Sequence, residues 1–217
     1  MTVWFTSDLH LGHLKVAQER GFDDPDAHDV AIYDSLESTL KRGDQLWILG
    51  DMTVGGSAAE AAALFGLGAI AAPAHGIELH LIAGNHDSCH PMANRNSHNR
   101  QRAFLQTFTS VQLFARRRIA GQPVMLSHFP YRGDHSDEDR GTQYRLRDRG
   151  EWILHGHTHS HEVDHREVIV FTEFGGGPIR KRRRDKQIHV GWDAWHRPVS
   201  LEQIEAIIEL GVRSEAL

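Results

Sequence analysis

The chain has 217 residues, of which 40% are hydrophobic and 24% are charged, and its formal net charge is −5. This composition is typical of a globular protein and unlike that of disordered chains, and the length fits one domain over residues 1–217. The negative charge excludes a general electrostatic attraction to nucleic acid or anionic membranes, and a single cysteine, Cys89, excludes an internal disulfide.

Five short apolar segments predict buried strands. They cover residues 3–6, 45–50, 78–84, 123–127 and 151–154, and each is bounded by glycine or by polar residues. Short apolar runs between turn residues are typical of strands that are covered on both faces. We therefore expect a sheet core built from these segments.

Helical patterns lie between and after the strands. Residues 27–40 place apolar side chains near one face, and residues 57–72 are rich in alanine. At the end of the chain, Ser200 and Gln203 form a possible capping box in front of a helical apolar pattern. Strands interleaved with helices indicate an α/β fold, in which ligands bind beyond the carboxyl ends of the strands.

A densely charged segment, residues 131–150, separates two of the predicted strands. It contains both acidic and basic residues, which favours a surface excursion and not a buried element. Loops at strand ends often carry functional residues, but a solvated loop needs no function. The sequence leaves open whether this segment borders a site.

Polar residues that can bind metal follow all five predicted strands. A short match such as Gly-Asp or Ser-His is weak by itself, because it is common in turns. Five matches in order, each after a strand, have a chance probability on the order of a few per cent or less. In chain order these residues are Asp8 and His10, Asp51, Asn85, His128, and His157 and His159.

These donors suit hard or borderline divalent ions. They comprise carboxylates, one carboxamide and imidazoles, without a thiolate, and so fit manganese, iron, zinc or nickel, with manganese favoured. Seven protein ligands exceed the usual three or four of one catalytic ion. The sequence therefore predicts two divalent metal ions that share an aspartate.

The motifs DLH, GD, GNHD, SH and GHTH, which run from residue 8 to residue 159, resemble the signature of calcineurin-like metallophosphoesterases. The short chain and the segments GNHDSCHP and HVGWDAWHRPVSLEQI are most similar to small bacterial and phage phosphoesterases of that superfamily. The resemblance implies a four-layer α/β/β/α sandwich, with two mixed sheets packed face to face and helices outside.

The resemblance also implies a role for each motif residue. Three residues (Asp8, His10 and His159) would bind the first metal, three (Asn85, His128 and His157) would bind the second, and Asp51 would bridge them. His86 would not bind metal but would act on the phosphate or protonate the leaving oxygen, and Asp87 would orient His86.

The expected activity is hydrolysis of phosphodiesters by a hydroxide that bridges the two metals, on small substrates such as cyclic nucleotides. Alternatives are a phosphomonoesterase or nucleotide-polyphosphate hydrolase, a nuclease that uses the basic run at residues 180–184, and a metal-containing module that binds another protein. Nucleic acid is not the expected partner, because the net charge is negative and the basic run is short.

The expected location is the cytoplasm, without a membrane partner. The N-terminus MTVWFTSDLH lacks the basic and apolar regions of a signal peptide. The most apolar stretch, residues 61–74, is shorter than the roughly 20 residues that span a bilayer. The sequence does not indicate an oligomeric state.

Overall fold

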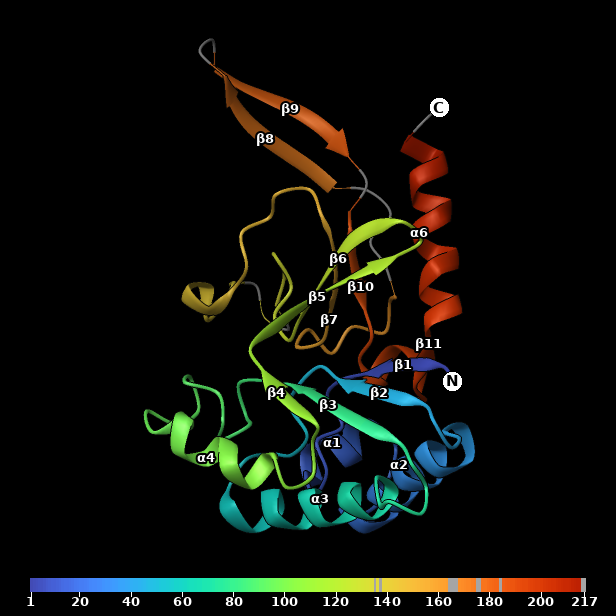
Figure 1. The fold of residues 1–217 in the computed structure, drawn as a ribbon. Helices are drawn as coiled ribbons and strands as arrows, with labels where there is room; N and C mark the ends of the chain where they lie inside the picture. Colours follow the sequence, from blue (N-terminus) through green and yellow to red (C-terminus); the bar gives the residue numbers. More distant parts are fainter. Residues whose placement is uncertain (135, 137, 164–167, 175–176, 184, 216–217) are drawn as a thin grey trace.

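The computed structural model describes residues 1–134, 136, 138–163, 168–174, 177–183 and 185–215. Two mixed sheets form its centre (Figure 1). The first sheet has the order β11-β1-β2-β3-β4, in which only β11 runs antiparallel to its neighbour. Its strands, in that order, are Val199–Ser200, Val3–Thr6, Gln45–Ile48, Glu78–Ile82 and Ser110–Gln112.

The second sheet has the order β10-β7-β6-β5, with β5 antiparallel to β6 and the other pairs parallel. Its strands are Gln187–His189, Trp152–His155, Gln122–Ser127 and Phe114–Ile119. A separate antiparallel hairpin is formed by β8 (Val168–Phe174) and β9 (Gly177–Arg183), and it projects from the rest of the fold in Figure 1. The basic run at residues 180–184 begins on β9, and Arg184 lies outside the described residues.

Helices flank both sheets. The helices α2, α3 and α4 cover one face of the first sheet, and α6 runs beside the second sheet (Figure 1). The helices are α1 (Leu14–Glu19), α2 (Pro25–Thr39), α3 (Ser57–Ile70), α4 (Ser97–Phe104), α5 (Trp192–Trp195) and α6 (Leu201–Glu215), with a 3₁₀ turn at Thr142–Tyr144. Two mixed sheets flanked by helices confirm the predicted α/β sandwich. None of the helices among these residues combines the length and the apolar character needed to cross a membrane.

The first sheet is buried on both faces, and successive side chains of its strands alternate between these two faces. Leu46 and Ile48 on β2 pack with the helices, whereas Trp47 and Leu49 pack toward the second sheet and α6. Successive side chains of a strand point to opposite faces, so a strand with both faces covered is apolar throughout. This alternation explains why the predicted strands are continuous apolar runs.

Local capping residues set the helix ends. The predicted helix 27–40 begins two residues earlier, at Pro25, because the carboxylate of Asp24 accepts a hydrogen bond of 2.8 Å from the amide of Ala27. The predicted capping box before α6 is confirmed. The side chain of Gln203 accepts from the Ser200 amide at 3.1 Å, and the Ser200 hydroxyl accepts from the Gln203 amide at 3.3 Å.

Candidate metal site

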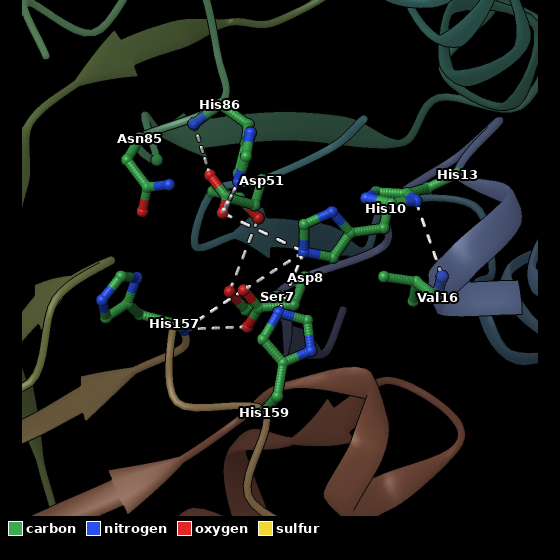
Figure 2. A network of polar contacts seen from close by, with 12 residues as sticks. Ser7, Asp8, His10, His13, Val16, Asp51, Asn85, His86, His157 and His159 are labelled. Atoms are coloured by element: carbon green, nitrogen blue, oxygen red, sulfur yellow. Dashed lines mark hydrogen bonds and ion pairs between the residues drawn. The ribbon is translucent and has the colours of Figure 1, made fainter. Parts of the chain in front are cut away.

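All seven predicted metal ligands lie together beyond the carboxyl ends of five strands, and Figure 2 labels all of them except His128. The strands β1, β2 and β3 of one sheet and β6 and β7 of the other each end just before one of the polar motifs. A hydrogen bond joins the motifs of the two sheets, because the amide of His157, which follows β7 of the second sheet, donates to the carboxylate of Asp8, which follows β1 of the first. Within the second sheet, the amide of Gly156 donates to the carbonyl of His128. The two sheets therefore build one site.

The first group of ligands consists of Asp8, His10 and His159, whose ligand atoms lie within 4.8 Å of one another. The Nε2 atoms of His10 and His159 face each other at 3.1 Å. Two imidazole nitrogens can share this short distance only with a proton between them or with a common cation beside them. The arrangement fits a divalent metal.

The second group contains Asp8, Asp51 and His128, again with ligand atoms within 4.8 Å of one another. The Nε2 of His128 lies 3.4 Å from Oδ2 of Asp51 and 3.0 Å from Oδ1 of Asn85. The same Asp51 oxygen is 4.0 Å from Nε2 of His10, which belongs to the first group. The Asp51 carboxylate therefore belongs to the second group and also faces a ligand of the first, as expected of a bridging ligand, and Asp8 belongs to both groups.

The contact that each histidine makes with a neighbouring acceptor indicates which ring nitrogen faces the site. His128 donates from Nδ1 to the carbonyl of Leu49 at 2.8 Å, which directs Nε2 to the site. The ring of His157 lies beside Asn85 in Figure 2, and its Nε2 is 3.1 Å from Oδ2 of Asp134. Metal-binding histidines commonly use their second ring nitrogen in this way, which fixes the orientation of the ring.

The sequence did not indicate Asp193, which supports the first group. Its Oδ2 lies 3.0 Å from Nδ1 of His159. Arg20 donates to both carboxylate oxygens of Asp193, at 2.8 and 3.0 Å, and also to the backbone carbonyl of Asp8 at 2.7 Å. The Arg20 side chain is only 4% exposed, so a buried arginine connects the loop of Asp8 to the aspartate that contacts His159. Asp193 lies in the segment HVGWDAWHRPVSLEQI, but only its position in the fold shows this role.

Asp134, in the charged segment 131–150, contacts His157, which is a predicted ligand of the second metal. Its side chain has 0% exposure and accepts from Nη2 of Arg145 at 3.0 Å as well as contacting His157. The segment therefore borders the site. Its charged composition was visible in the sequence, but it contains several acidic residues and no pattern that singles out Asp134.

The carboxylate of Asp87 contacts the backbone of two ligand-bearing loops. It is buried and accepts three backbone hydrogen bonds, from Gly84 at 2.7 Å, Asp51 at 3.0 Å and Met52 at 3.1 Å. Among the described residues, no hydrogen bond or ion pair joins it to the ring of His86. Asp87 therefore holds the loop backbone, and its orientation of His86 stays a prediction.

His86 differs from the metal ligands in its exposure. Its ring is 42% exposed, and its Nε2 lies 3.9 Å from Oδ2 of Asp51. It belongs to neither group of converging ligand atoms. Its backbone amide donates to Oδ1 of Asp51 at 2.8 Å, which holds the residue at the rim of the site.

Burial and neighbouring charges set the protonation of the site. Burial alone would raise the pKa of Asp51, but His128 lowers it well below its usual value. Burial alone would lower the pKa of His128, but Asp51 raises it to about 9. Burial lowers the pKa of His10 and, together with the charge of His128, brings the pKa of His157 to about 3. The carboxylate and the neutral imidazoles are the forms that bind metal, and a bound cation would displace the proton of His128.

The backbone of the site is strained. Seven non-glycine residues among those described have a positive φ, and five of them are predicted ligands. Such conformations are uncommon for residues with a Cβ atom and cluster at functional sites, where the surrounding structure maintains them. The five are Asp8, His10, Asp51, His157 and His159, with φ of 56°, 49°, 53°, 70° and 51°.

Glycines next to the ligands allow this close packing. A Cβ atom at Gly84 would collide with the carboxylate and backbone of Asp51, and one at Gly156 would collide with Ser7 and Asp8. Rigid backbone and buried ligand side chains cannot move away from such an atom. The glycines of the GNHD and GHTH motifs are therefore required by the geometry of the site.

Nitrogen and oxygen donors that converge beyond the strands of an α/β sandwich can hold divalent metal ions, as in metal-dependent hydrolases. The chain belongs to the calcineurin-like phosphoesterase superfamily, since the model of that superfamily domain matches residues 1–191. The match confirms the family that the motifs predicted and, with it, the prediction of a metal-dependent phosphoesterase.

Three known proteins are similar to this chain in sequence or in fold. The Gene 66 protein of Mycobacterium phage L5 is 40% identical over 214 residues, which cover 94% of this chain and 93% of that protein. The Gene 66 protein of Mycobacterium phage D29 is 39% identical over 211 residues, with 95% of each chain covered. A protein of unknown function from Aquifex aeolicus is 18% identical and shares the fold, with a TM-score of 0.62 over 95% of this chain and 98% of that one.

Proposed function

We propose that the protein hydrolyses phosphodiester bonds with two divalent cations. Three residues (Asp8, His10 and His159) bind the first cation, and three (Asn85, His128 and His157) bind the second. Asp51 bridges them. The observation that supports this most directly is the position of the Asp51 carboxylate, 3.4 Å from Nε2 of His128 and 4.0 Å from Nε2 of His10.

When bound, such a cation pair neutralises phosphate charge and activates a water molecule for attack. The residues of the chain supply the remaining chemistry. Asp134 and Asp193 hold the rings of His157 and His159 in place, which keeps the donors preorganised. His86 is exposed beside the site and lies in neither ligand group, so its ring contacts the phosphate or gives a proton to the leaving oxygen.

The proposed substrates are small phosphodiesters such as cyclic nucleotides. A diester substrate is proposed by analogy with compact members of the superfamily. The proposed metal is manganese, and iron, zinc and nickel are the alternatives that the same oxygen and imidazole donors fit. A cytoplasmic setting belongs to the same proposal, since Cys89, the single cysteine, is buried and forms no disulfide.

The test is turnover of a substrate panel by protein loaded with manganese. The panel contains bis-aryl and mono-aryl phosphates, cyclic nucleotides and single-stranded nucleic acid. Diester hydrolysis should dominate, and it should be lost on chelation and in Asp51→Asn, whose metal content should fall at both sites. His10→Ala should weaken one site only. The exposed Asp23→Asn serves as the control.

Other outcomes would favour the alternatives. Preference for mono-aryl phosphates would indicate a phosphomonoesterase. Tight, salt-sensitive binding of nucleic acid that is lost on replacement of Arg182, Arg183 and Arg184 by alanine would indicate a nuclease. Absence of any metal-dependent turnover would favour a protein-binding module. Full activity and two bound metals in Asp51→Asn would contradict the bridging role.

A further inference from the structure

A cavity of about 470 Å³ adjoins the site on the side of Asn85 and His86. Three segments of the chain form its wall. They are the loop before α3 with the first turn of that helix, the turn after β3, and the segment that leads into α4. Its volume lies within the range of about 300–1,000 Å³ that is typical of small-ligand sites. The cavity can therefore hold a group attached to a phosphate in the site.

Most residues that line this cavity have polar side chains. Apart from its glycines, the one lining residue without a polar side chain is Ala93. Ligand pockets usually have predominantly apolar walls, which favour aromatic or aliphatic groups. A polar wall instead favours a group that can form hydrogen bonds, because an apolar group here would displace water without replacing its contacts.

Arg100 on α4 is held rigidly at this wall. Its Nη2 donates to Oε1 of Glu60 at 2.6 Å, and its Nε donates to the hydroxyl of Ser88 at 3.0 Å. Glu60 is only 2% exposed and also accepts from the amide and the hydroxyl of Ser88, at 3.0 and 2.8 Å. Two of the three guanidinium nitrogens are thus fixed by contacts across three segments.

The remaining nitrogen of Arg100 is available to a ligand. Within the described part of the chain, Nη1 has no hydrogen-bond partner, and the side chain is 40% exposed. A planar guanidinium that is already fixed loses little conformational freedom when its last donors bind an acceptor. Because Glu60 compensates its charge, Arg100 offers a directed hydrogen-bond donor and little net positive charge.

We propose that this cavity binds the leaving group of the substrate and that Arg100 donates from Nη1 to an oxygen of that group. The inference rests on the proposed function, in which His86 acts at the leaving oxygen. Since His86 lines the cavity, the departing group lies there. The polar wall and the directed donor select a leaving group with hydroxyl or ether oxygens, such as a sugar, over an aryl or alkyl group.

The test compares two phosphodiesters on protein loaded with manganese. The leaving oxygen of 2′,3′-cyclic AMP belongs to a ribose, whereas bis(p-nitrophenyl) phosphate releases an aryl oxide. Arg100→Ala should raise KM for the cyclic nucleotide by about tenfold or more, because one charged donor to a ligand oxygen is lost. KM for the aryl diester should change by less than about twofold. Arg102→Ala, an exposed arginine on the same helix, should change neither.

A second variant separates substrate binding from folding. Arg100→Ala leaves the buried carboxylate of Glu60 without its arginine, which lowers stability. The double variant Glu60→Gln with Arg100→Gln removes both charges together and should show the same selective rise in KM. An equal loss on both substrates in the double variant, or no change on either, would overturn the inference.

A binding measurement distinguishes failure of this inference from failure of the proposed function. Adenosine, which contains the ribose without a phosphate, is titrated into zinc-loaded protein, because Zn²⁺ is diamagnetic, while the Nε–H resonance of Arg100 is followed by NMR. A saturable shift is expected whether or not the protein hydrolyses diesters. Metal-dependent hydrolysis without this shift would refute the assignment of the cavity and leave the proposed function intact.

Discussion

The Nε2 atom of His157 lies 3.1 Å from Oδ2 of Asp134, a carboxylate with no exposed side-chain surface. Arg145, whose side chain is 4% exposed, donates to the same oxygen at 3.0 Å. A buried arginine, a buried aspartate and a metal-site histidine thus form a chain. A corresponding chain of Arg20, Asp193 and His159 lies on the other side of the site, so both GHTH histidines are held in the same manner.

Asp134 should therefore affect the affinity for metal although it is not itself a ligand. Asp134→Asn should weaken metal binding at the second site by about 10- to 100-fold, because the His157 ring loses a fixed orientation and a charged partner. Competition with a fluorescent chelator measures this affinity, and the spectrum of the cobalt-substituted protein reports on the coordination. Glu138→Gln, an exposed change in the same segment, is the control. Two metals bound with unchanged affinity in Asp134→Asn would refute the role.

Arg20 should matter much more for stability than a surface lysine does. Removal of one partner of a buried ion pair costs about 3–5 kcal/mol, and Arg20→Ala also leaves the carbonyls of Asp8 and Leu9 without their donor. Lys15→Ala removes an exposed pair with Glu19 and should cost less than about 1 kcal/mol. Urea unfolding of the two variants tests this. Similar losses in both would contradict the importance of the Arg20 contacts.

His86→Ala should retain both metals and lose activity according to the leaving group. If His86 gives a proton to the leaving oxygen, substrates with alkoxide leaving groups should lose about 10²- to 10⁴-fold in rate, and activated aryl esters much less. Metal content is measured on the same preparation, and His128→Ala, in which the second site should lose its metal, is the control. An equal loss on both substrates would instead assign His86 to the charge on the phosphate. Loss of a metal would refute its separation from the ligands.

Asp44 provides a test of pH-dependent stability away from the site. Burial alone would raise the pKa of this carboxyl, but hydrogen bonds from the amides of Thr2 and Lys41 and from the Trp4 indole lower it below its usual value. Because the pKa of Asp44 is lower in the folded state, its charged form stabilises the folded protein. This stabilisation is fully present above the unfolded pKa of about 3.9, and it is lost as the pH falls through the lower folded pKa.

Asp44→Ala should accordingly destabilise the protein by about 2–4 kcal/mol at pH 7, since three donors lose a charged acceptor. The difference from the unmodified protein should shrink as the pH falls below about 4. Urea unfolding at several pH values measures it, with the exposed Asp23→Ala as the control. A difference that stays constant down to pH 3 would show that the charge of Asp44 does not contribute.

The sequence by itself determined the sheet core and the set of candidate ligands. Each strand is a short apolar run because it is covered on both faces, and each ligand follows directly after a strand, so both signals are local along the chain. Donor types alone indicated a cation site. The assignment of ligands to two ions remains a prediction.

Only the tertiary structure decided which residues support the site. Asp134 and His157 are 23 positions apart and Asp193 is 34 positions from His159, and their contacts depend on the paths of loops without a periodic pattern. The contacts of Asp87 likewise depend on where the backbone amides of Asp51 and Met52 lie after folding. The cavity at Arg100 arises where three segments meet, and no single one of them encodes it.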